Sequence, residues 1–96
     1  MELDEVKKIL ENHKKTLEQN FRVKGIGIFG SYVRGDQKDK SDVDVLVEFD
    51  EPVSLLEVVK LENYLSDLLQ IKVDLVPQKD IRQELREKIL KETIYL

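Results

Sequence analysis

The chain has 96 residues, with 16 lysines and arginines against 20 aspartates and glutamates, so its formal net charge is −4. It contains no cysteine and one histidine. These counts exclude a disulfide framework, a thiol nucleophile and a metal site built from cysteines or from several histidines of one chain. They also argue against direct binding to nucleic acid, which usually needs a basic excess. The length predicts a single domain, 1–96, without a second lobe for substrate.

No segment of the sequence has the character of a membrane or export signal. The longest apolar runs span a few residues, far short of the about 20 that cross a bilayer as a helix. The first residues, Met1–Glu5, are acidic and lack the apolar centre of a signal peptide. We therefore expect a cytoplasmic protein whose chemistry uses carboxylates, hydroxyls, lysines, arginines or a metal bound by oxygen.

The first half of the chain predicts one helix and two strands. Apolar residues three or four apart predict a helix over 3–19, with His13 half-buried at the edge of the core. A β-rich run predicts a strand over 23–29. A polar passage over 32–41 leads to a second strand over 42–49, in which the odd positions are apolar.

The second half predicts two more helices and a third strand. Residues 54–57 have the form of a capping box and open a helix that ends near Leu69. Residues 71–76 form a strand, Asp80 caps a final helix, and 93–96 add a short extended tail. This order predicts an α+β fold of two layers, in which helices pack against a small mixed β-sheet.

One glycine motif is misleading. Residues Gly25–Gly30 match the pattern G-x-G-x-x-G of dinucleotide-binding folds. That motif follows a strand and opens a helix, whereas here the strand runs through it. Too few residues separate it from the turn at Gly35 for a crossover helix. We therefore reject a dinucleotide site.

Two aspartates carry the stronger signal. Strand alternation places Asp42 and Asp44 on one face, opposite Val43 and Val45. Two neighbouring carboxylates resist joint ionisation unless a cation lies between them. Because all the ligands are oxygens, Mg²⁺ or Mn²⁺ is favoured over zinc.

A third aspartate, Asp74, lies in the apolar strand over 71–76. If that strand neighbours the strand over 42–49, three carboxylates converge, as in two-metal sites for phosphoryl displacement. Gly30 allows close approach of the backbone, the Ser31 hydroxyl and amide can hold phosphate oxygens, and Arg34 can reach the same anion. Each aspartate alone also fits an ordinary structural role, as a turn cap or a solvent-facing strand residue.

These residues carry a family resemblance. Residues 30–35 (Gly-Ser-Tyr-Val-Arg-Gly) and 41–47 (Ser-Asp-Val-Asp-Val-Leu-Val) resemble the signature of the DNA polymerase β-like nucleotidyltransferase superfamily. The short length and the ending over 89–95 resemble its minimal nucleotidyltransferases (MNT), the antitoxins of HEPN/MNT toxin–antitoxin pairs. Val33 departs from the pattern, in which alanine is commoner.

The resemblance implies a role for each residue of the motif. Asp42 and Asp44 would bind two Mg²⁺ ions, and Asp74 would bind the catalytic ion and help to deprotonate the acceptor hydroxyl. Gly30 and Ser31 would grip the triphosphate. The implied reaction is transfer of AMP from ATP to a tyrosine hydroxyl of a HEPN ribonuclease toxin, which silences it.

Two rival functions stay open at this stage. The chain could be a non-catalytic module that neutralises a toxin by masking its surface, although masking alone does not need three aspartates. A polymerase or tRNA-end activity is less favoured, because no nucleic-acid platform is visible. A chain this small leaves its site incomplete, so the missing walls would come from a partner, from a second copy in a homo-oligomer, or from nothing. Its acidic balance would attract a basic toxin.

Overall fold

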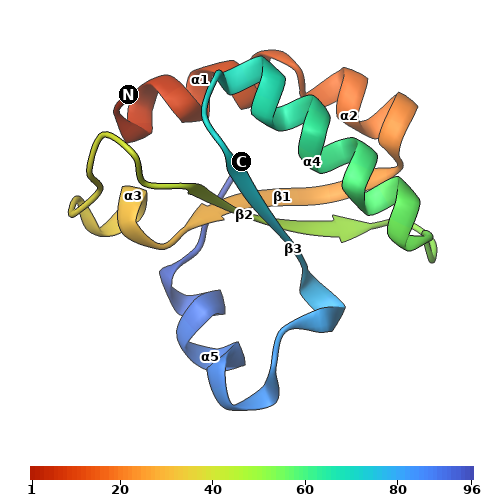
Figure 1. The fold of residues 1–96 in the computed structure, drawn as a ribbon. Coiled ribbons are helices and arrows are strands. Elements are labelled where there is room, and N and C mark those ends of the chain that lie inside the picture. Colours follow the sequence, from red (N-terminus) through yellow and green to blue (C-terminus); the bar gives the residue numbers. More distant parts are fainter.

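Four strands form a mixed sheet in the computed structural model, which describes residues 1–96. They are β1 (Val23–Phe29), β2 (Val43–Phe49), β3 (Val73–Pro77) and β4 (Ile94–Tyr95). The strand order is β3-β2-β1-β4 (Figure 1). β1 pairs antiparallel with both β2 and β4, whereas β2 pairs parallel with β3. The predicted mixed sheet is confirmed.

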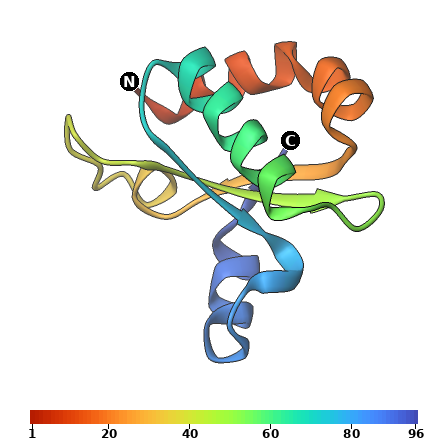
Figure 2. The ribbon, with the colours of Figure 1, turned by 45° about the vertical axis from the view of Figure 1, so that its right-hand side comes forward.

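Helices cover the two faces of this sheet unequally. α1 (Leu3–Asn12), α2 (Lys14–Phe21) and α4 (Leu55–Leu69) form a layer on one face, and α5 (Gln83–Glu92) lies on the other (Figures 1 and 2). The one-turn helix α3 (Ser31–Arg34) directly follows β1. α4 is the crossover between the parallel strands β2 and β3. None of these helices combines the length and the apolar character needed to span a membrane.

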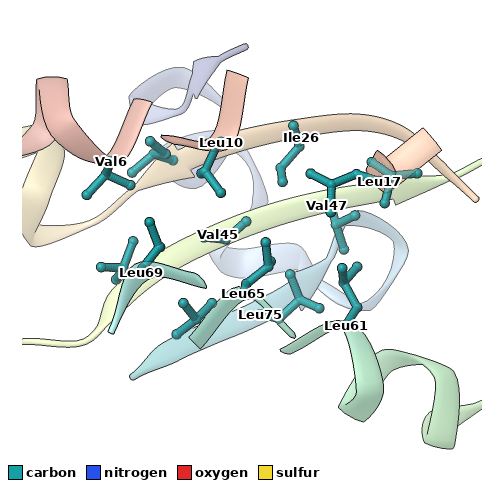
Figure 3. Packing of buried hydrophobic residues seen from close by; sticks show 14 of the residues in the cluster. Val6, Leu10, Leu17, Ile26, Val45, Val47, Leu61, Leu65, Leu69 and Leu75 are labelled. Atoms are coloured by element: carbon teal, nitrogen blue, oxygen red, sulfur yellow. The ribbon is translucent and has the colours of Figure 1, made fainter. Parts of the chain in front are cut away.

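The main core lies between the sheet and the layer of three helices (Figure 3). Leu61, Leu65 and Leu69 of α4 are fully buried there, since they recur every fourth residue on one side of the helix. β2 contributes the alternate residues Val43, Val45 and Val47 to the same core. The alternation predicted for this strand is therefore confirmed.

A smaller apolar cluster lies on the opposite face of the sheet. Phe29, Leu46 and Ile81 are buried together, with Ile89 and Leu90 of α5 packed against them. Leu46 is thus buried although it falls between the alternating positions, because α5 covers that part of the second face. The rest of this face stays open at the start of β2 and β3.

The predicted helix over 3–19 is wrong in one respect, because it is broken at His13. α1 ends at Asn12 and α2 begins at Lys14. The Nδ1 of His13 donates to the carbonyl of Ile9 at 2.9 Å, and its backbone N–H bonds to Leu10 instead. The imidazole of His13 thereby occupies the Ile9 carbonyl oxygen, which in a regular helix would accept the backbone N–H of His13. His13 is half-buried, as predicted.

The predicted start of the last helix is also wrong. Asp80 ends a short 3₁₀ turn, η1 (Gln78–Asp80), and α5 begins only at Gln83. Ile81 between them is extended and buried in the smaller cluster. Because the extended Ile81 is buried in this cluster, the helix does not begin at Asp80, where the sequence predicted its cap. The extended tail over 93–96 is confirmed as β4, whereas the third strand begins at Val73 rather than at 71.

α4 also protects the edge of the sheet. β3 is an edge strand, so some of its amides lack a neighbouring strand. The amide of Val73 donates to Oγ of Ser66 at 3.0 Å, and that of Leu75 donates to Oε2 of Glu62 at 2.9 Å. These two side chains satisfy donors that would otherwise invite pairing with another chain.

The close packing of β4 on β1 generates a test. A Cβ at Gly27 would lie 2.5 Å from Cγ2 of Thr93 and 3.0 Å from the Ile94 carbonyl oxygen, so Gly27→Ala must displace β4. We expect it to lower the free energy of unfolding by about 1–3 kcal/mol, measured by urea denaturation. Gly25→Ala is the matched control, because its Cβ would meet only Glu48, at 3.6 Å or more. Equal stability of the two variants would contradict this packing.

Candidate active site

Asp44 and Asp74 lie side by side on the open face of the sheet. They are direct register partners on the parallel strands β2 and β3. Their neighbours Val43 and Val73 are buried in the main core, so both aspartates point away from it. Two carboxylates from strands far apart in the sequence are thus brought together, as the sequence predicts.

Asp42 occupies a more peripheral place. It lies one residue before β2, and its Oδ2 is 3.9 Å from Nζ of Lys72. Both side chains are substantially exposed, so this ion pair contributes little to stability. Its negative charge is nevertheless close enough to contribute to the raised pKa of Asp44.

Repulsion and burial act on Asp44. Its pKa is raised to about 6, first because burial disfavours the charged form and then because Asp74 and Asp42 repel it. The guanidinium of Arg34 partly offsets this rise, whereas Glu92 adds to it. A carboxylate held in this way favours binding of a cation, since a cation removes the repulsion.

Gly30 forms the wall of the site next to Asp44. Its φ of 79° and ψ of −151° belong to a backbone region that is essentially restricted to glycine. A Cβ at this position would also collide with the carboxylate of Asp44. Ser31 begins α3 directly after this turn. The Gly-Ser sequence therefore brings the main chain close to the acidic pair.

Arg34 is held beside this turn by Glu92, the last residue of α5. The Nη1 of Arg34 donates to Oε1 of Glu92 at 2.7 Å, and its Nε donates to Oδ2 of Asp36 at 3.5 Å. The other carboxylate oxygen of Glu92 accepts the amide of Gly30 at 3.1 Å. The hydrogen bond that Arg34 donates to Glu92 and the negative charges nearby raise the pKa of Arg34, so it stays a cation.

A hollow of about 370 Å³ connects these groups. Four of the predicted residues line it: Gly30, Arg34, Asp44 and Asp74. Asp42 and Ser31 are not among the residues that line it. Its other wall is α5 and the turn before it, which present cations and apolar side chains at Arg82, Leu85, Lys88 and Ile89.

The sequence interpretation missed the contribution of α5. Lys88 and Glu92 lie on this highly charged helix and Arg82 directly precedes it, so nothing in the sequence distinguishes these site residues from solvated ones. One signal was available for Glu92, because it directly precedes the extended tail predicted over 93–96. Pairing of that tail with β1 brings Glu92 toward Gly30.

The donor set suits a hard divalent cation. All candidate ligands are carboxylate oxygens, which Mg²⁺ and Mn²⁺ prefer. As arranged here, no three acidic or histidine side chains are close enough to form a ready metal-binding cluster. Asp44 and Asp74 are nonetheless adjacent register partners on one face, with Asp42 one residue before the same strand as Asp44. The chemistry of this donor set therefore fits a hard divalent cation.

This arrangement can support a specific chemistry. A cation at Asp44 and Asp74 would lie beside the Gly30 turn and the guanidinium of Arg34. Backbone amides and guanidinium groups bind phosphate oxygens, and divalent cations neutralise the charge that develops in phosphoryl transfer. The site is thus suited to a reaction on a phosphate ester or a nucleoside triphosphate.

Comparison with known proteins leads to the same chemistry. The model of the nucleotidyltransferase domain matches residues 10–96. The protein adenylyltransferase MntA of Thermococcus cleftensis is 47% identical over 94 residues, which cover 98% of this chain and 95% of that protein.

Solved structures share the fold. One described as a minimal nucleotidyltransferase has a TM-score of 0.85 and 32% identity and covers 100% of this chain and 97% of its own. A toxin–antitoxin structure with AMP-PNP has a TM-score of 0.74 and 25% identity over 88% of this chain and 70% of its own. The MNT antitoxin complex with a tri-AMPylated HEPN toxin of Shewanella oneidensis has a TM-score of 0.67 and covers 92% of this chain and 69% of its own. At 21% identity, it shows the fold alone.

The raised pKa of Asp44 predicts how pH affects stability without metal. A carboxyl whose folded pKa is about 6, against 3.8 normally, binds its proton more tightly when folded. Stability should therefore fall as pH rises from about 4 to 6. Asp44→Asn should remove this fall and be more stable at pH 7 by roughly 1 kcal/mol, after allowance for solvent screening.

The measurement is chemical denaturation of both proteins between pH 4 and 8 in the presence of a chelator. Asp67→Asn, an exposed aspartate of α4, removes the same charge elsewhere and should leave the pH profile of the wild type. An Asp44→Asn profile parallel to that of the wild type would show that the pKa of Asp44 is not raised in the metal-free protein.

Proposed function

Because this chain belongs to the nucleotidyltransferase domain family, we propose that it is a protein adenylyltransferase that acts as an antitoxin. It transfers AMP from ATP to a hydroxyl, a tyrosine hydroxyl in our proposal, of a partner HEPN toxin. The family relation supports nucleotidyl transfer in general. The choice of AMP and of a protein acceptor is supported by the name of the relative in Thermococcus cleftensis.

One observation carries the proposal: Asp44 and Asp74 are register partners beside the Gly30 turn. A purely structural sheet would not place two unpaired carboxylates in adjacent positions, because their repulsion is costly. It would also not need, next to them, a backbone conformation that is essentially restricted to glycine. Together these features cost stability in the metal-free protein, which is typical of a site kept for function.

We assign the roles of the residues as follows. Asp42 and Asp44 would hold two Mg²⁺ ions (Mn²⁺ is an alternative), and Asp74 would share the catalytic one. Mg²⁺, when bound, neutralises charge on the triphosphate and on the leaving pyrophosphate. Ser31 would bind the phosphates through its amide and hydroxyl and Arg34 through its guanidinium, whereas Gly30, whose own amide donates to Glu92, would let the main chain approach them closely.

The transfer itself is an in-line displacement. The oxygen of the acceptor hydroxyl attacks the α-phosphorus of ATP, and the bond from that phosphorus to the bridging oxygen of the β-phosphate breaks. Pyrophosphate leaves with the electron pair of this bond. The proton of the acceptor hydroxyl passes to the carboxylate of Asp74, which is exposed beside Asp44 and within reach of an incoming side chain.

The partner would complete the site. The hollow is bounded on one side by the sheet and on the other by α5, and its lining leaves Asp74 exposed to an approaching protein. The similar toxin–antitoxin structure with AMP-PNP supports a toxin as this partner, and in our proposal it is a HEPN protein, as the sequence motif implies. A second copy of this chain is the other candidate for the missing wall.

A second candidate function is masking of the toxin by binding alone. Leu55 and Leu56 at the start of α4 are 79% and 63% exposed, and Val59 one turn later is 41% exposed. Exposed apolar side chains grouped in this way suit a protein contact. Masking and modification are compatible in one complex, so the two functions need a test that separates them.

Mass spectrometry of the partner toxin provides that test. The toxin is incubated with this protein, Mg²⁺ and each of the four nucleoside triphosphates in turn. We expect a mass increase of one or more AMP units with ATP, because only an enzyme adds nucleotide to the toxin. Full inhibition of the toxin without any added mass would support masking and contradict the proposed enzyme.

Asp44→Asn tests the assignment of the site in the same assay. Loss of this carboxylate should slow transfer by about a thousandfold while the fold is kept, as checked by circular dichroism. Asp67→Asn on α4 is the matched control and should transfer at the rate of the wild type. Normal transfer by Asp44→Asn would show that the metal assignment is wrong.

A further inference from the structure

We propose that Glu92 is a positioning residue for the nucleotide site: its carboxylate holds the Gly30 turn and the Arg34 guanidinium in the arrangement that receives the phosphates. This inference rests on the proposed function, since it concerns the binding of ATP. It adds a residue from the far end of the chain to the site. Glu92 itself would touch neither the acceptor nor the reacting phosphorus.

The pairing of β4 with β1 brings Glu92 to this place. Gly27 lies opposite Tyr95, and Ile28 lies opposite Ile94. Glu92 ends α5 two residues before Ile94, and Gly30 lies two residues after Ile28. The pairing of β4 therefore brings the end of α5 next to the end of β1, where the Gly30 turn begins.

The end of α5 is fixed as well. Thr93 is buried, its amide donates to the carbonyl of Ile89 at 3.0 Å, and its hydroxyl donates to the same oxygen at 2.6 Å. Because Gly27 leaves no room for a Cβ beside Thr93, this residue is held tightly against β1. Glu92 thus projects from a constrained position.

Each oxygen of the Glu92 carboxylate has its own partner. Oε2 accepts the amide of Gly30 at 3.1 Å, and Oε1 accepts Nη1 of Arg34 at 2.7 Å. The side chain of Glu92 is only 16% exposed, whereas that of Arg34 is 50% exposed. A charge-assisted hydrogen bond to a mostly buried carboxylate restricts the guanidinium far more than an exposed ion pair does.

The contact leaves Arg34 able to bind phosphate. A guanidinium has five N–H donors, and this one uses one for Glu92 and one for Asp36. Three donors therefore remain, in a plane whose orientation the carboxylate sets. Without Glu92, an arginine this exposed would sample many rotamers, and ordering it would weaken the binding of the nucleotide.

A rival interpretation of the same contact predicts the opposite effect. Glu92 could compete with the phosphates for Gly30 and Arg34, as an internal substitute for the anion. Removal of the carboxylate would then tighten nucleotide binding. In our proposal its removal weakens binding, so the direction of the change decides between the two.

The test is calorimetric titration of the wild type, Glu92→Gln and Glu92→Ala with AMP-PNP and Mg²⁺, together with KM and kcat for AMP transfer. We expect Glu92→Ala to raise the Kd of AMP-PNP and the KM for ATP about tenfold. Glu92→Gln, which keeps one acceptor oxygen, should raise them less. The maximal rate at saturating ATP should change by less than about threefold, because Glu92 touches neither the acceptor nor the reacting phosphorus.

Two controls separate positioning from general stability. Glu87→Gln removes a carboxylate from the same helix, one that pairs with Lys91 at the surface, and should leave Kd and KM unchanged. In an Arg34→Ala background, Glu92→Ala should raise Kd clearly less than it does in the wild type, because only the contact with the Gly30 amide remains to be lost. A merely structural glutamate would not show this dependence.

The outcomes are distinct. Tighter binding by Glu92→Ala would support competition and overturn the proposal. Unchanged Kd and KM with a lower melting temperature would make Glu92 structural and also overturn it. If Glu92→Ala does not fold, the isosteric Glu92→Gln decides by the same criteria. If the wild type does not bind AMP-PNP, the proposed function itself fails and this inference falls with it.

Discussion

The parallel pairing of β2 with β3 is the contact on which the site depends. It joins segments that are 30 residues apart in the register pair Asp44 and Asp74, and only the crossover helix α4 makes such a pairing possible. Leu61, Leu65 and Leu69 press α4 onto the sheet, and Glu62 and Ser66 of the same helix bond to the edge of β3. One helix therefore fixes both the register and the acidic pair.

One face of the sheet carries the main hydrophobic core, and the other carries the candidate active site. The face beneath α1, α2 and α4 is continuously apolar and provides the stability of the molecule. The other face carries like charges, a raised pKa at Asp44 and a turn at Gly30 that a residue with a side chain could not adopt without strain. The small cluster around Leu46 and Ile81 holds α5 against this second face, so that α5 forms one wall of the hollow beside Asp44 and Asp74. Stability on one face thus offsets the cost of the site on the other.

Sequence patterns predicted those features that depend on neighbours in the chain. Alternation around Val43 and Val45 gave the strand and the orientation of Asp44, and the family motif gave Gly30 and Arg34. Patterns could not predict the break at His13 or the late start of α5, because a side-chain hydrogen bond and the burial of Ile81 decided them. Glu92 was missed for the same reason, since its partners lie some 60 residues away in the chain.

The central claim is that Asp44 and Asp74 hold a divalent cation beside the phosphates of a nucleotide. The most direct measurement is a crystal structure with Mn²⁺ and AMP-PNP, in which anomalous scattering locates the metal. The account predicts an anomalous peak within bonding distance of both carboxylates, with the phosphates against the Gly30 turn and Arg34. A nucleotide bound elsewhere, or a bound nucleotide without metal at the two aspartates, would contradict it.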